Sequence, residues 1–175
     1  MHHRHLLSVL VENRPGVLTR IAGMFARRGY NIHSLAVGPT DDDRISRLTV
    51  VVGAEAVQLE QIIKQLNKLV HVLKIVELDE TESVERELQL IKVTADGHAR
   101  SEIIELADVF RAKVVDVAHE TLTIEVAGSP GKLEAMAELL EPYGIRELVR
   151  SGTIALSRGS RSITDGSKLR MQRVI

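Results

Sequence analysis

One order of strands and helices occurs twice along this chain, and the repeat limits the possible folds more than any other feature. In the first copy, runs rich in Val, Ile and Leu predict strands, and apolar residues three or four apart predict the helices between them. The predicted strands cover residues 5–11, 32–37, 45–52 and 72–78, and the predicted helices cover 15–28 and 56–68. The order is βαββαβ, with Gly29 placed to end the first helix.

The same order returns in the second half of the chain. Strands are predicted at 88–94, 114–118, 122–127 and 145–156, and helices at 101–112 and 132–141. Each of the four helices has one apolar face that should meet a sheet. The expected inward residues are Leu18, Ile21, Ala22 and Phe25; Leu59, Ile62, Ile63 and Leu66; Ile103, Leu106, Ala107 and Phe110; and Leu133, Met136, Ala137 and Leu140.

The repeat predicts an α+β protein made of two ferredoxin-like βαββαβ domains. We expect the first domain at 1–78, an acidic linker at 79–86, the second domain at 87–159 and a loose basic tail at 160–175. Each domain is near the lower size limit for an independent core. A dimer would therefore bury surface that a single copy leaves exposed.

The composition excludes several classes of function. The chain has no cysteine, which rules out disulfides, thiolate catalysis and cysteine-ligated zinc. Its formal net charge of −1 gives no general attraction to nucleic acid. No apolar run approaches the roughly 20 residues that a membrane-spanning helix needs, and the first residues lack the apolar core of a signal peptide. We expect a cytoplasmic protein without a membrane segment.

The most specific motif lies where the first strand meets the first helix, in V-E-N-R-P-G-V-L at 11–18. Pro15 suits the first turn of a helix, and Gly16 lets a ligand approach the backbone. The N–H groups of Gly16, Val17 and Leu18 should lack helical partners at the positive end of the helix. Such a turn can bind a small carboxylate. No general base, nucleophile or metal cluster accompanies it, so the motif favours sensing an anion over transforming one.

The second copy has A-D-G-H-A-R at the equivalent turn, and nothing there indicates the same site. We therefore place ligand binding in the first domain. Plainer interpretations remain open, because N-R-P-G could be only a strand–helix turn and Asn31 could simply tolerate a left-handed backbone. His2, His3 and His5 could bind a metal, although a cationic tip is simpler, and the acids at 41–43 could bind Mg²⁺, although a solvated loop is simpler.

Several blocks of the chain resemble a known family. V-E-N-R-P-G-V-L resembles the effector loop of ACT domains, which are amino-acid-sensing βαββαβ modules. The wider match is similar to the regulatory (small) subunit family of acetolactate synthase, and it extends to about Gly159. The matching blocks are R-R-G-Y-N-I-H-S-L-A-V-G-P-T-D-D at 27–42, S-R-L-T-V-V-V at 46–52, Q-L-N-K-L-V-H-V-L-K at 65–74, V-E-R-E-L at 84–88 and R-S-G-T-I-A-L-S-R-G at 150–159.

The resemblance implies a chain that has no catalytic residues and no cofactor of its own. In this family the catalytic (large) subunit carries thiamine diphosphate, Mg²⁺ and FAD, and the small subunit activates it and confers feedback inhibition by valine, leucine or isoleucine. The family's effector site lies between the ACT domains of a homodimer. The matching effector-binding positions are Asn13, Gly16, Val17, Leu18, Asn31 and Ile32.

The chemistry of these positions suits an amino acid. The side-chain oxygen of Asn13 or Asn31, or a nearby carbonyl, could accept the ammonium, and Val17, Leu18 and Ile32 could line an apolar pocket. One methylene in such a pocket discriminates by only about 1–3 kcal/mol. The sequence therefore does not rank valine, leucine and isoleucine.

Two other functions remain possible from the sequence. A free-standing ACT-type sensor acting on another partner, such as a transcriptional regulator, would need a DNA-binding element, and the sequence has no helix-turn-helix outside the two repeats. A small ferredoxin-like enzyme resembling an acylphosphatase would need an Arg and an Asn converging on an anion. Arg14 and Asn31 are the residues available for that pair.

Overall fold

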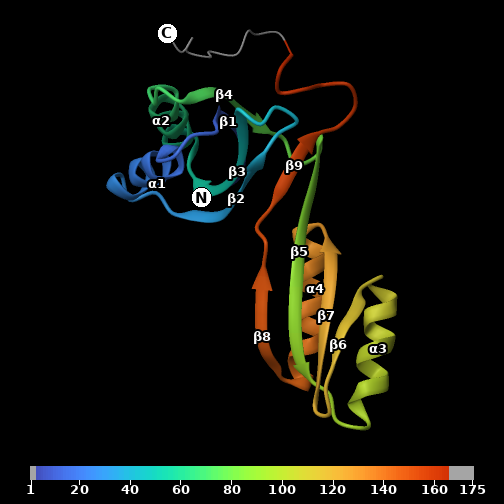
Figure 1. Ribbon diagram of the computed structural model, residues 1–175. Coiled ribbons are helices and arrows are strands. Elements are labelled where there is room, and N and C mark those ends of the chain that lie inside the picture. The colour runs from blue at the N-terminus through green and yellow to red at the C-terminus, as the bar shows by residue number, and fades with distance from the viewer. Residues whose placement is uncertain (1–2, 166–175) are drawn as a thin grey trace. The chain divides into compact units, whose positions relative to one another are not determined.

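The computed structural model describes residues 3–165 of the 175-residue chain. These residues separate into two compact units, one formed by 3–84 with 153–165 and the other by 85–152 (Figure 1). His2 and the part of the predicted basic tail at 166–175 lie outside the described residues.

The first unit follows the predicted βαββαβ order. Its elements are β1 (His3–Glu12), α1 (Val17–Arg27), β2 (Ile32–Pro39), β3 (Ile45–Ala54), α2 (Ala56–Asn67) and β4 (Val72–Leu78). The four strands form one antiparallel sheet in the order β2-β3-β1-β4, so β2 and β4 are its edges. This confirms the ferredoxin-like fold predicted for the first domain.

Both helices of the first unit pack on one face of its sheet. Side chains alternate along β1, and Leu7, Val9 and Val11 meet the helices in the main core. The predicted inward face of α2 is confirmed, with Ile63 packed against this core and three residues buried in it: Leu59, Ile62 and Leu66. The predicted end of α1 is also confirmed, since Gly29 has φ +68° directly after the C-cap Arg28.

The buried face of α1 differs from the prediction. Ile21 and Phe25 are buried as expected, but Leu18 is 41% exposed and Ala22 is also exposed. The residues buried from α1 are Val17, Ile21, Met24 and Phe25. Two overlapping apolar rows run along this helix, and helical spacing alone does not choose between them. Packing on the sheet selects the row that contains Val17 and leaves Leu18 facing outward.

The opposite face of the first sheet is covered by residues that follow the second unit in the chain. Leu6 packs with Ala155 in one apolar cluster, and Leu10 packs with Ile163 in another. The Thr153 N–H donates to the Ser34 Oγ at 2.7 Å. Both faces of β1 are therefore covered, and residues 153–165 supply part of the first unit's core.

The second copy has the same element order. Its elements are β5 (Ser83–Thr94), α3 (Ala99–Val109), β6 (Lys113–Val117), β7 (Thr121–Gly128), α4 (Pro130–Leu140), a 3-10 turn η1 (Glu141–Tyr143) and β8 (Ile145–Arg150). The chain then returns to the first unit with β9 (Ile154–Ser157), which pairs with β5. The sheet order is β6-β7-β5-β8, and α3 and α4 lie on one side of it (Figure 1). The inward helix faces are confirmed, with Leu106, Phe110 and Ala137 only partly buried and the remainder fully buried: Ile103, Ala107, Leu133, Met136 and Leu140.

Two strand predictions differ substantially from the structure. β5 begins at Ser83, inside the acidic stretch expected to be a linker. The single strand predicted at 145–156 is two strands, because Gly152 takes φ +83° and interrupts the extended chain between them.

Candidate functional site

The turn between β1 and α1 is shaped by Gly16. Gly16 has φ +83°, a left-handed backbone that side chains disfavour, and it caps α1. The first helical hydrogen bond runs from the Arg20 N–H to the Gly16 carbonyl at 3.1 Å. Because α1 begins at Val17, Pro15 lies before the helix, and its predicted place in the first turn is wrong.

Two of the three N–H groups expected to be free lack a backbone partner. Across residues 3–165, neither the Gly16 N–H nor the Leu18 N–H donates to another backbone group, and both residues are exposed. The Val17 N–H donates to the Arg14 carbonyl at 3.4 Å, a long hydrogen bond, so the expectation of three free groups is wrong for Val17. The turn thus presents exposed donors at the positive end of α1.

Asn13 ties this turn to the β2–β3 hairpin. Its backbone N–H donates to the Arg44 carbonyl at 2.7 Å, and its side-chain Nδ2 donates to the Asp43 carbonyl at 2.8 Å. The amide oxygen of Asn13 accepts no hydrogen bond in the described part of the chain, so it keeps its capacity to accept one. In the hairpin, hydrogen bonds from the Arg44 side chain and backbone hold the pKa of Asp42 at about 2.

The equivalent turn of the second unit has its donors occupied. The Asp96 Oδ1 accepts hydrogen bonds from the N–H groups of His98 at 3.3 Å and Ala99 at 3.0 Å, at the start of α3. A carboxylate of the chain itself therefore sits where the first unit leaves exposed donors. The two copies differ in chemistry at the position where their sequences diverge.

Asn31 and Ile32 lie at the other end of the first sheet. Ile32 begins β2 and pairs with Val52, which in turn pairs with His5 near the start of β1. Asn13 follows Glu12, at the far end of β1. Seven residues at ~3.4 Å separate His5 from Glu12, which is about 24 Å. One copy of the chain therefore brings Asn13, Gly16, Val17 and Leu18 together and does not bring Asn31 or Ile32 to them.

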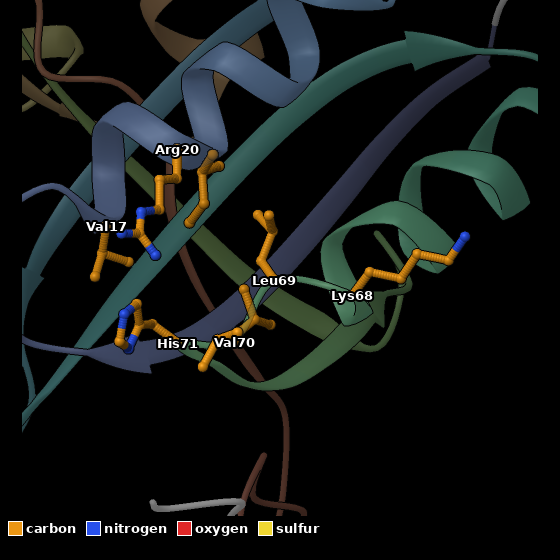
Figure 2. Close-up of a pocket in the computed structure, with 8 residues that line it drawn as sticks. Val17, Arg20, Lys68, Leu69, Val70 and His71 are labelled. Atoms are coloured by element: carbon orange, nitrogen blue, oxygen red, sulfur yellow. The ribbon is translucent and has the colours of Figure 1, made fainter.

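A cavity of about 130 Å³ lies beside the turn, between α1 and the segment that joins α2 to β4 (Figure 2). Its lining residues are Val17, Arg20, Ile21, Lys68, Leu69, Val70, His71 and Val72. In Figure 2 the Arg20 side chain extends from α1 toward His71, whereas the Lys68 side chain points away from the other labelled residues. Most of the lining is aliphatic, and the polar groups of Arg20 and His71 stand together at one end.

A buried carboxylate fixes His71 at this cavity. The Glu12 side chain is 6% exposed, and its Oε2 lies 3.0 Å from His71 Nδ1 and 3.1 Å from Arg14 Nε. The Glu12 N–H also donates to the His71 carbonyl at 2.9 Å. Because an ionised carboxylate only accepts hydrogen bonds, the His71 ring donates from Nδ1 and leaves Nε2 as its second polar atom. Sequence reasoning missed Glu12 and His71, which are 59 residues apart and meet only through the pairing of β1 with β4.

Two of the other residues considered from the sequence, His5 and Arg14, have side-chain partners of their own. The His5 Nδ1 lies 2.8 Å from the Glu77 Oε1. No group of three or more His, Asp or Glu side chains suited to a metal occurs within residues 3–165. Arg14 is paired with Glu12, and Asn31 lies at the opposite end of the sheet, so one copy does not make these two converge on an anion as an acylphosphatase-like site would require.

None of the helices in the described range is long and apolar enough to cross a membrane.

Family models match both halves of the chain. Residues 7–74 match the model described as the small-subunit-like ACT domain of AHAS, and residues 86–159 match the model described as the small subunit of acetolactate synthase.

Individual relatives agree with these matches. The chain is 60% identical over 159 residues to the acetolactate synthase small subunit of Mycolicibacterium smegmatis, covering 91% of this chain and 94% of that protein. It is 51% identical over 158 residues to a probable acetolactate synthase small subunit of Archaeoglobus fulgidus, covering 90% of this chain and 99% of that one. The crystal structure of the acetolactate synthase small subunit from Thermotoga maritima superimposes with a TM-score of 0.84 at 41% identity, covering 91% of this chain and 99% of that chain.

Proposed function

The chain belongs to the acetolactate synthase small-subunit family, which serves branched-chain amino-acid biosynthesis, and from that membership we propose that it activates the catalytic subunit and confers feedback inhibition by a branched-chain amino acid. In this proposal the chain itself is non-catalytic and cytoplasmic. Thiamine diphosphate, Mg²⁺ and FAD belong to the catalytic partner.

The observation that carries the regulatory part of the proposal is the pair of exposed donors at the start of α1. The Gly16 and Leu18 N–H groups suit the carboxylate of an amino acid. Leu18, 41% exposed beside them, offers apolar surface to an aliphatic side chain. No metal-binding group of His, Asp or Glu side chains occurs among residues 3–165, which favours reversible binding over metal-assisted chemistry at the turn.

The complete effector site in this proposal needs two copies of the chain. β2 is an edge strand with Val37 51% exposed, so its outer edge is open to a second β2. If two β2 strands pair antiparallel around a two-fold axis, the start of one lies beside the end of the other. Asn31 and Ile32 of one copy then stand about three strand spacings of ~4.8 Å, or about 14 Å in all, from the other copy's 13–18 turn. Side chains and a bound ligand can bridge that interval.

Substitution of Gly16 tests this function. Gly16→Asp places a carboxylate where the ligand's carboxylate should bind, and no heavy atom lies within 4 Å of the added Cβ. Gly16→Asn has nearly the same shape, and Asn tolerates the left-handed backbone well. We expect calorimetry to show valine binding abolished by Gly16→Asp and retained, although weaker, in Gly16→Asn. Gly16→Asn is the control for the left-handed backbone, and Gly97→Asp, at the equivalent turn of the second unit with open space at its Cβ, is the control for an added carboxylate.

The same variants are then mixed with the catalytic subunit. An effector changes activity only through its different affinity for two states of the complex, usually worth about 1–3 kcal/mol. Gly16→Asp should therefore still activate the catalytic subunit but leave it resistant to valine. Unchanged valine affinity in Gly16→Asp would place the effector elsewhere, and failure of wild-type protein to bind or activate the catalytic subunit would contradict the function itself.

A further inference from the structure

The cavity between α1 and the α2–β4 segment has a shape and chemistry that the two-copy effector site does not use. It lies entirely within one copy, with walls from Val17 and Ile21 on α1 and from Leu69, Val70 and Val72 across from them. The proposed effector site instead uses the exposed surface of the 13–18 turn. The cavity is therefore a separate feature of the first unit.

The volume limits what can enter. An apolar cavity of about 150 Å³ can hold benzene, and this one measures about 130 Å³. By comparison with benzene, a branched group of about four carbons fits this cavity, whereas the larger indole or nucleotide base does not. The aliphatic walls favour hydrocarbon over a polar group.

The polar end of the cavity has the groups needed to bind a carboxylate. Within residues 3–165 the Arg20 side chain forms no hydrogen bond or ion pair, and it extends toward His71 in Figure 2. Its guanidinium is shaped to bind a carboxylate with two parallel hydrogen bonds. His71 is held by Glu12 through Nδ1, so the position of its ring is determined before a ligand arrives. Glu12 is already bonded to two side chains and does not line the cavity.

We propose that this cavity binds a short branched aliphatic carboxylate, with the carboxylate on Arg20 beside His71 and the hydrocarbon between Val17, Leu69 and Val72. Three kinds of compound share that chemistry: a branched-chain amino acid, its 2-oxo acid and a simple branched fatty acid. Val17 joins the cavity to the effector turn, because its side chain lines the cavity while its backbone lies between the Gly16 and Leu18 donors. An occupant would stabilise the helix start that presents those donors.

The test follows methyl signals by NMR in the full-length chain carrying Gly16→Asp, which removes the proposed effector site. L-valine, 3-methyl-2-oxobutanoate and isovalerate are titrated separately to millimolar concentration. Saturable shifts of the Ile21, Leu69 and Val72 methyls are expected with at least one ligand, and the ligand that binds best identifies the source. The Leu18 methyls, which point outward, report on the effector turn instead.

Arg20→Gln tests the carboxylate contact. Hydrogen bonds to a charged group typically contribute enough to change affinity ten-fold or more. We expect at least a ten-fold loss of affinity in Arg20→Gln and no change in Arg27→Gln, the matched substitution two turns further along α1 and outside this cavity. Absence of saturable shifts with all three ligands, or equal affinity in the two variants, would overturn the proposal. Either result leaves the effector-turn proposal untouched, because that site is already removed in this background.

Discussion

Mixed dimers of two defective variants provide a direct test of a shared effector site. The first variant, Gly16→Asp, damages the turn, and the second, Asn31→Ala, removes one polar partner at the start of β2. If each site combines the turn of one copy with Asn31 of the other, both homodimers have only damaged sites. A mixed dimer has one doubly damaged site and one intact site.

The expected fraction of intact effector sites follows from the strand pairing and from the way the copies mix. Within one copy, the chain of pairs from Ile32 through Val52 to His5 puts Asn31 about 24 Å along the sheet from the Asn13 end of β1, too far for one small ligand. Random mixing of equal amounts gives about half mixed dimers, so about a quarter of all sites become intact. Purified mixed dimers, carrying a different tag on each copy, should bind about one valine per dimer.

Calorimetry of the mixture measures this recovery as binding stoichiometry. The affinity of the recovered sites should equal that of the wild type, since nothing in the intact site has changed. Asn31→Ala removes a hydrogen bond to a charged group, so its own homodimer should bind about ten-fold or more weakly. A mixture with no wild-type-like sites, despite verified subunit exchange, would refute the register argument. It would mean that the turn and Asn31 act in the same copy or that Asn31 does not contact the ligand.

Two further predictions concern the first unit. Ile163→Ala should lower the free energy of unfolding by about 2 kcal/mol, because Ile163 is only 9% exposed in the cluster with Leu10. In urea denaturation, the control Ile154→Ala should lower it by less than about 0.5 kcal/mol, because Ile154 is 60% exposed. Equal losses in the two variants would contradict the packing of Ile163 against the first sheet. Asp42 has a pKa of about 2 against an ordinary 3.8, so its contact with Arg44 should stabilise the fold fully above pH ~3.8 and lose that effect as the pH falls toward 2. NMR titration should return the Asp42 pKa toward 3.8 in Arg44→Gln, and an unchanged value would show that Arg44 is not its cause.

The elements of this protein were predictable because their causes are local. Within residues 3–165, apolar spacing located all four α-helices, and runs of β-branched residues located the strands of both copies. Gly29 ends α1 as predicted because a left-handed residue after a helix favours glycine. The 11–18 motif and five further blocks also indicated the family, and the family models match residues 7–74 and 86–159.

Other features depended on contacts between distant segments. Helical spacing was compatible with two different buried faces of α1. Packing on the sheet buries Val17 and leaves Leu18 exposed. The segment 153–165 has no periodicity that would indicate its place against the first sheet, where Ala155 and Ile163 enter two apolar clusters. Burial of that kind depends on a surface formed by other strands, and a local pattern contains no information about that surface.

The sequence by itself determined the repeated βαββαβ order, the family and the turn at 13–18. Only the tertiary structure placed that turn and Asn31 at opposite ends of the first sheet. Strand order and register decide which residues share an end of a sheet. The same pairing joined Glu12 to His71 across 59 residues, beside the cavity between α1 and the α2–β4 segment. Spacing along a chain specifies the faces of single elements, whereas a site made from several elements exists only after they have paired and packed.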